Sequence, residues 1–181
     1  MADNDVPETP TTCILEPDEV AAIRRRAKMC LRFVPLLSAV TTGEPPFSRF
    51  LDIWQDGTVY NSALYTLLLP VIPKVRDLVM QIARIPEDVP QVPSRIFVSM
   101  YPQGYQSGMR VHRDSMVAYG AVTMVVTDDA VDGQLYAQSG GGVRYPIPLA
   151  AGWAVGMHPD IWHGVEEVMR RSDRISITFF F

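Results

Sequence analysis

The chain has 181 residues, of which 48% are hydrophobic and 20% charged, and a formal net charge of −4. These values are ordinary for one globular domain, and the acidic balance provides no electrostatic footprint for a nucleic acid or an anionic membrane. Two cysteines offer no disulfide framework, and the acidic start lacks the basic and apolar regions of a signal peptide. We therefore expect a cytoplasmic protein that does not span or bind a membrane.

The first half of the chain predicts an arm followed by helices. Residues 1–12 are polar with two prolines, and are predicted to form a disordered arm before a single domain, 13–181. A helix is predicted from Pro17 to the residue before Pro35, because proline and acids occupy its first turn and apolar residues recur at helical spacing. Asp56-Gly57 between apolar runs predicts a hairpin.

Two further helical segments follow, and prolines then end this region. Residues 62–69 and 71–85 have the spacing of buried helices, and Pro86, Pro90 and Pro93 come directly after them. The helical support is therefore predicted to cover 13–92, and the core of the domain 93–181.

From residue 95 onward the pattern is typical of strands. Short apolar or alternating runs are separated by glycine-rich and aspartate-rich turns. The predicted strands are 96–98, 110–114, 121–126, 134–137, 143–147, 152–157, 166–169 and 174–181. Many short strands after a helical start predict a mostly β protein with flanking helices (α+β) and a jelly-roll core.

The three histidines of the chain all lie in this second half. If His112 and Asp114 lie in an extended segment, both side chains point to the same face. Two imidazoles and one carboxylate can hold one face of a ferrous ion and leave the opposite positions open. The second imidazole would come from His163 or from His158.

The last strand carries a second polar pattern. Arg174 and Ser176 share one of its faces, and Ile175 and Ile177 share the other. An arginine there could bind the far carboxylate of an oxoacid through a two-pronged, charge-assisted contact.

Taken together, these motifs resemble the Fe(II)/2-oxoglutarate-dependent dioxygenase superfamily, whose core is a double-stranded β-helix, and in particular its AlkB-like and prolyl-4-hydroxylase-like members. The resemblance covers about half of the chain, from Pro93 to Phe181. It rests on ordered motifs, namely Ser99–Gly104, His112–Asp114, Asp128–Asp129 with Asp132–Leu135, Gly152 with His163–Val165, and Arg174–Phe179.

The resemblance implies roles for particular residues. His112, Asp114 and His163 would bind Fe(II), with His163 preferred to His158 because His-Gly-Val matches the distal motif of the family and Arg174 follows at its usual separation. The co-substrate 2-oxoglutarate would be held by three further side chains, Arg174, Ser176 and Tyr101. The metal would also bind O2. The helices of the first half would back the larger sheet of the barrel.

The resemblance also implies an activity, hydroxylation of a C–H bond with release of succinate and CO2. The short acidic chain favours a small metabolite or an amino-acid derivative as substrate. Oxidation or demethylation of a nucleic-acid base, hydroxylation of a peptidyl side chain, and a cupin-like protein that binds without turnover stay open as alternatives, as does the choice between monomer and homodimer. AlkB-like repair enzymes carry a second arginine six positions after the arginine that binds 2-oxoglutarate. This chain has Phe180 at that position, and the difference disfavours a nucleic-acid substrate.

Overall fold

The computed structural model describes residues 8–34, 48–103, 107–114, 117–127, 134–168 and 173–181. The helices and 3-10 turns are α1 (Pro17–Leu31), α2 (Ser62–Leu68), η2 (Leu69–Val71), α3 (Ile72–Ile82) and η3 (Pro86–Asp88). The strands are β1 (Thr11–Cys13), β2 (Arg49–Gln55), β3 (Thr58–Val59), β4 (Arg95–Tyr101), β5 (Ser107–His112), β6 (Ala121–Val125), β7 (Leu135–Gln138), β8 (Arg144–Ile147), β9 (Trp153–Met157), β10 (Trp162–Val168) and β11 (Arg174–Phe180).

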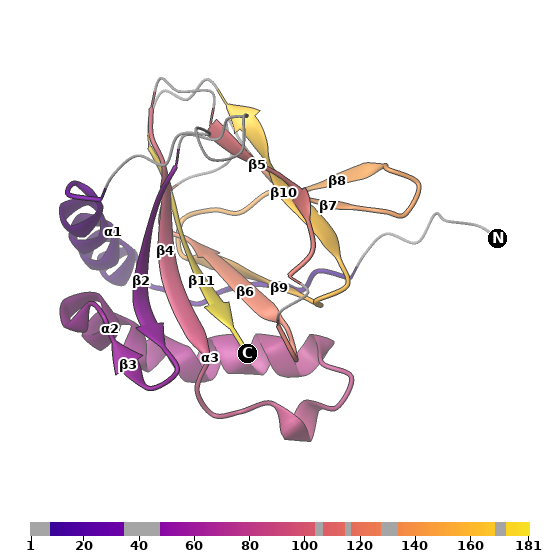
Figure 1. The fold of residues 1–181 in the computed structure, drawn as a ribbon, viewed down its shortest axis with the longest axis horizontal. Helices are drawn as coiled ribbons and strands as arrows, with labels where there is room; N and C mark the ends of the chain where they lie inside the picture. The colour runs from indigo at the N-terminus through magenta and orange to yellow at the C-terminus, as the bar shows by residue number, and fades with distance from the viewer. Residues whose placement is uncertain (1–7, 35–47, 104–106, 115–116, 128–133, 169–172) are drawn as a thin grey trace.

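The strands form two antiparallel sheets. The larger sheet has the order β1-β9-β6-β11-β4-β2-β3, and the smaller has the order β5-β10-β7-β8. Side chains from both sheets line one cavity, so the sheets are opposite walls of a barrel. In Figure 1 the helices lie along one side of the larger sheet, and the smaller sheet lies away from them. This arrangement confirms the predicted mostly β fold with a jelly-roll core and helices packed on the larger sheet.

Strand β11 shows how the sequence separates core from cavity. It lies between β4 and β6 in the larger sheet. Ile175, Ile177 and Phe179 join the hydrophobic cluster that the helices also enter, whereas Arg174 and Ser176 line the cavity on the opposite face. Because successive side chains of a strand alternate between faces, one strand supplies both the core and a polar wall.

The helices are held in place by their caps and their apolar stripes. Glu16 and Glu19 form a reciprocal capping box at the start of α1, with a proline inside the first turn. The buried stripe of α1 and that of α3 enter the same cluster as the outer face of the larger sheet. Each fully buried aliphatic side chain contributes about 1.5–3 kcal/mol. None of the described helices has the length and apolar character needed to cross a membrane.

Three differences between the observed and the predicted elements are larger or closer to the histidines than the others. β1 pairs with β9 and begins at Thr11, inside the segment predicted as an arm. β5 ends at His112, so Asp114 lies beyond the strand rather than on it. β10 begins at Trp162, four residues before the predicted strand, because its first residues pair with β7. The predicted turn at 128–133 and its aspartate motif lie outside the described residues, as do residues 1–7.

Candidate metal and co-substrate site

Two histidines from neighbouring strands meet at the edge of the cavity. His112 is the last residue of β5, and His163 is the second residue of β10. The two are register partners in the smaller sheet, and their ring centroids lie 4.4 Å apart. The pairing of β5 with β10 therefore brings together imidazoles that are 51 positions apart in the sequence.

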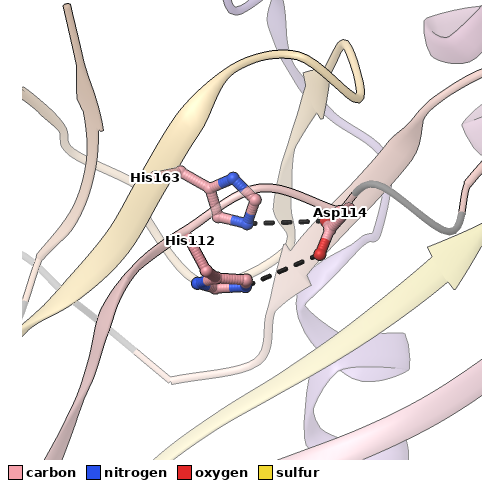
Figure 2. A group of neighbouring side chains, drawn as sticks. All are labelled: His112, Asp114 and His163. Atoms are coloured by element: carbon pink, nitrogen blue, oxygen red, sulfur yellow. Dashed lines mark ion pairs between the residues drawn. The ribbon is translucent and has the colours of Figure 1, made fainter.

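Asp114 completes the group (Figure 2). Its carboxylate lies to one side of both rings and faces their Nε2 atoms, with Oδ1 3.5 Å from Nε2 of His112 and Oδ2 3.5 Å from Nε2 of His163. The side chains of Asp114 and His163 are only 14% and 7% exposed, whereas that of His112 is 37% exposed. One side of the group is thus enclosed by the barrel, and the side of His112 faces outward.

Backbone carbonyls fix the orientation of both imidazoles. Nδ1 of His112 lies 2.9 Å from the carbonyl oxygen of Arg110, and Nδ1 of His163 lies 3.0 Å from that of Ile161. A carbonyl oxygen can only accept a hydrogen bond, so Nδ1 is the donor in both rings. In the neutral imidazole Nε2 then carries the lone pair. Both Nε2 atoms are directed at the carboxylate, which is the orientation that a shared cation requires.

Burial and charge affect the two imidazoles differently. Burial lowers the pKa of His163, and the negative charge of Asp114 offsets this only in part. Burial also acts to lower the pKa of His112, but the hydrogen bond to Asp114 and the carbonyl of Arg110 outweigh it, so this pKa is raised. His163 is therefore held in its neutral, metal-binding form. At His112 a bound cation would replace a proton that the carboxylate otherwise stabilises.

The donor set fits a divalent transition metal. The ligand atoms of His112, Asp114 and His163 lie within 4.8 Å of one another, so a single ion could contact all three. Two imidazole nitrogens and one carboxylate are the donor set of non-haem Fe(II) sites with open positions. These residues are the ones that the sequence predicted as ligands.

A buried polar cluster occupies the larger sheet. Arg174 is 1% exposed, and its Nη1 donates a hydrogen bond of 3.1 Å to Oγ of Ser176. The hydroxyl of Ser176 lies 2.8 Å from that of Ser99 on β4. The guanidinium also lies over the ring of Tyr101, 5.5 Å from its centroid. We call Arg174, Ser176, Ser99 and Tyr101 the arginine cluster.

We call His112, Asp114 and His163 the metal group. The metal group and the arginine cluster line the same cavity, which has a volume of about 430 Å³. The cavity brings together the predicted metal ligands and the predicted co-substrate residues, although the two histidines and the co-substrate residues lie on different sheets. A volume of this size falls within the range of about 300–1,000 Å³ that is usual for small-molecule sites.

His158, the alternative second imidazole, lies elsewhere. Its Nδ1 is 3.5 Å from Oδ2 of Asp160 and accepts a hydrogen bond from the backbone N–H of that residue. It lines a second cavity with Arg84 and Arg113, apart from the metal group. The structure therefore brings His163, and not His158, next to His112 and Asp114.

The sequence analysis assigned no role to some residues of the cavity. Ser99 is hydrogen-bonded within the arginine cluster, and its place two residues before Tyr101 on one strand face could have indicated this. Phe50 and Arg95 also line the cavity. Their contribution depends on the pairing of β2 with β4, which no local pattern reveals.

Comparison with protein-family models finds no match, and no curated protein sequence matches either. Solved structures do match. A prolyl-4-hydroxylase from Pseudomonas putida has a TM-score of 0.67 at 17% identity, over 96% of this chain and 91% of that one. The epimerase SnoN from nogalamycin biosynthesis, in complex with Fe3+ and alpha ketoglutarate, has a TM-score of 0.70 at 15% identity, over 94% and 77%. OsALKBH1 has a TM-score of 0.62 at 14% identity, over 97% and 99%.

These similarities establish the fold. The chain shares the fold of these proteins, and its two antiparallel sheets around one cavity agree with the double-stranded β-helix that the sequence motifs predicted. The matched proteins differ in what their names say they act on, so the fold leaves the substrate open.

Proposed function

We propose that this protein is an Fe(II)- and 2-oxoglutarate-dependent oxygenase that hydroxylates a C–H bond of a small molecule, such as a metabolite or an amino-acid derivative. The observation that carries the proposal is the shared cavity. His112, Asp114 and His163 lie on one wall, and Arg174 with Ser176 lies on the other. A metal group alone, or a buried arginine alone, would support it far less.

In this proposal His112, Asp114 and His163 hold the iron. The Arg110 and Ile161 carbonyls keep both Nε2 atoms available, and Asp114 supplies a negative charge that offsets part of the charge of the cation. When bound, iron together with 2-oxoglutarate and O2 supplies the oxidising chemistry, in which one oxygen atom enters the new hydroxyl group, the other enters succinate, and CO2 leaves. The protein contributes placement and exclusion of water.

The arginine cluster holds the far carboxylate of 2-oxoglutarate. Arg174 is always charged and presents a planar set of donors, so it can bind a carboxylate through two hydrogen bonds. Ser176 and Ser99 extend this donor set through linked hydroxyls, and the ring of Tyr101 packs against the guanidinium. We assign the Tyr101 hydroxyl a further hydrogen bond to the co-substrate. Because Arg174 is buried, its charge is poorly screened and favours a dianionic co-substrate.

The test combines binding and turnover. The full chain, freed of metal, is titrated with Mn(II) and then with 2-oxoglutarate, and succinate release is measured with Fe(II) across a panel of metabolites, a peptide panel and methylated oligonucleotides. We expect about one metal per chain, co-substrate binding that requires it, and succinate release that one class of small molecule stimulates. Binding of metal and co-substrate without stimulation by any compound would favour a cupin-like binding protein. Stimulation by peptides or oligonucleotides alone would overturn the small-molecule assignment.

A further inference from the structure

The cavity has two chemically different ends. On β4 the residues facing the cavity are Tyr101, Ser99, Phe97 and Arg95, in order away from the arginine cluster. A strand rises about 3.3 Å per residue, so Arg95 lies about 13 Å along the strand from Ser99. A co-substrate bound at the arginine cluster therefore leaves this second end of the cavity for another molecule.

Aromatic side chains form the wall of the second end. The ring of Phe97 has its centroid 5.4 Å from that of Phe180 and 6.0 Å from that of Phe50, with the planes tilted by 47° and 51°. All three rings line the cavity and are half-buried. Among the described residues, neither of the two hydrophobic clusters of the core includes them. They therefore present aromatic surface to the cavity rather than filling the core.

A guanidinium lies at the edge of this wall. Cζ of Arg95 is 5.2 Å from the ring centroid of Phe97, and its Nε donates a hydrogen bond of 2.6 Å to Oδ1 of Asp52. Arg95 lines the cavity, whereas Asp52 is not part of its lining. Asp52 thus holds the guanidinium against the ring, and this bond uses one of the five N–H donors of arginine.

We propose that the substrate contains a planar aromatic ring that carries an oxygen acceptor, either a carboxylate or a carbonyl. The ring packs against Phe97 between Phe50 and Phe180, and the oxygen accepts a hydrogen bond from Arg95. Aromatic rings pack favourably in offset and tilted arrangements, which this wall already shows. Because 2-oxoglutarate shares the 430 Å³ cavity, the substrate part inside it is limited to a small ring system. This inference rests on the proposed function.

The probe that tests the inference is 2-naphthoate, with two relatives. Decahydro-2-naphthoate keeps the skeleton and the charge but is not planar, and 2-naphthamide keeps the ring and an uncharged acceptor. Affinities are measured by calorimetry on the full chain, metal-free and with Mn(II) and 2-oxoglutarate. Broadening of the probe's proton resonances by Mn(II) reports closeness to the metal. We expect 2-naphthoate to bind at least about ten-fold more tightly than its saturated relative and to be broadened. The amide distinguishes the acceptors, since its equal binding would assign a carbonyl and its weaker binding a carboxylate.

Variants locate the probe on the wall. Phe97→Leu and, independently, Phe180→Leu should each weaken the binding of 2-naphthoate about three- to ten-fold. Arg95→Met should weaken the binding of 2-naphthoate more than it weakens the binding of a naphthalene ring without an acceptor. Phe33→Leu is the matched control, because Phe33 is 83% exposed and outside the cavity. Equal affinity for the planar and the saturated acid, or wild-type affinity in both wall variants, would overturn the inference.

The same samples separate this inference from the proposed function. Mn(II) and 2-oxoglutarate affinities are recorded before each probe is added. Normal values for both, without preference for the planar probe, would overturn the aromatic site and leave the oxygenase proposal standing. Failure to bind Mn(II) would overturn the oxygenase proposal, and with it the role of this end of the cavity in substrate binding.

Discussion

His112 and His163 are direct register partners across β5 and β10, with ring centroids 4.4 Å apart. The metal group is therefore a product of strand pairing. Register shifts lie between His163 and Val165 and again before Val168, so this pairing is irregular along the rest of β10. Such bulges re-aim side chains at functional sites, and here the pair of imidazoles lies directly beside the first of these shifts.

The first prediction concerns the metal ligands. His112→Ala and Asp114→Ala should each weaken Mn(II) binding by more than about 100-fold, because loss of a second-shell residue already costs about 10–100-fold. Binding is measured by electron paramagnetic resonance of free Mn(II). His158→Ala is the matched control, because that imidazole lies next to Asp160 and outside the metal group. Metal affinity that is normal in both ligand variants, or is lost in the control, would contradict the assignment.

The second prediction concerns the co-substrate. Arg174→Lys should weaken 2-oxoglutarate by about ten-fold or more and leave metal affinity nearly unchanged, because lysine keeps the charge but loses the planar donor pair. Charge-assisted hydrogen bonds contribute about 1.5–3 kcal/mol, and about 1.4 kcal/mol corresponds to ten-fold. Arg84→Lys, at a side chain that is 79% exposed, is the control. Unchanged 2-oxoglutarate affinity in Arg174→Lys would mean that another residue is the anchor.

The third prediction separates the hydroxyls of the cavity. Ser99→Ala removes the partner of Ser176, so 2-oxoglutarate should bind about three- to ten-fold more weakly, since one hydrogen bond contributes about 1 kcal/mol. Thr178→Val is the control, because Thr178 and Thr123 form a similar hydroxyl pair, 3.2 Å apart, farther along the sheet. Calorimetric titration should show that only the serine variant loses affinity. Equal losses in both would contradict a specific role for Ser99.

Local patterns were enough to predict most of this architecture. The alternation of residues 174–181 predicted β11 and its polar face, and helical spacing predicted the stripes of α1 and α3. The sequence also predicted His112, Asp114 and His163 as metal ligands, and the structure brings these three side chains together. What could not be predicted depends on long-range pairing. The short β1 has no pattern of its own, and the aromatic wall needs β2 beside β4.

The fourth prediction concerns Gly164, which follows His163 on β10. A Cβ at this position would lie 2.5 Å from Oη of Tyr136 and 2.7 Å from the backbone carbonyl oxygen of Met109. The carbonyl belongs to the paired strand and cannot move aside cheaply, so Gly164→Ala should destabilise the protein by about 1–3 kcal/mol and also weaken Mn(II) binding. Gly141→Ala is the control, because its nearest atom would be 3.8 Å away. Chemical unfolding measures the stability of both variants. Equal stability of the two would contradict the close packing of β5 against β10.

The fifth prediction concerns nucleic acids. Phe180 lies six positions after Arg174 on the same face of β11 and belongs to the aromatic wall, so this position presents a ring, not a cation, to the cavity. The chain also has a net charge of −4, and neutralisation of phosphates dominates nucleic-acid affinity. DNA or RNA oligonucleotides with methylated bases should therefore bind weakly at about 0.1 M salt and should not raise succinate release above the level without substrate. The matched comparison is Phe180→Arg, which introduces a cation at this position and leaves His112, Asp114 and His163 unchanged. Base-dependent turnover of a methylated oligonucleotide by the unaltered chain would contradict this prediction and make a nucleic-acid base the substrate.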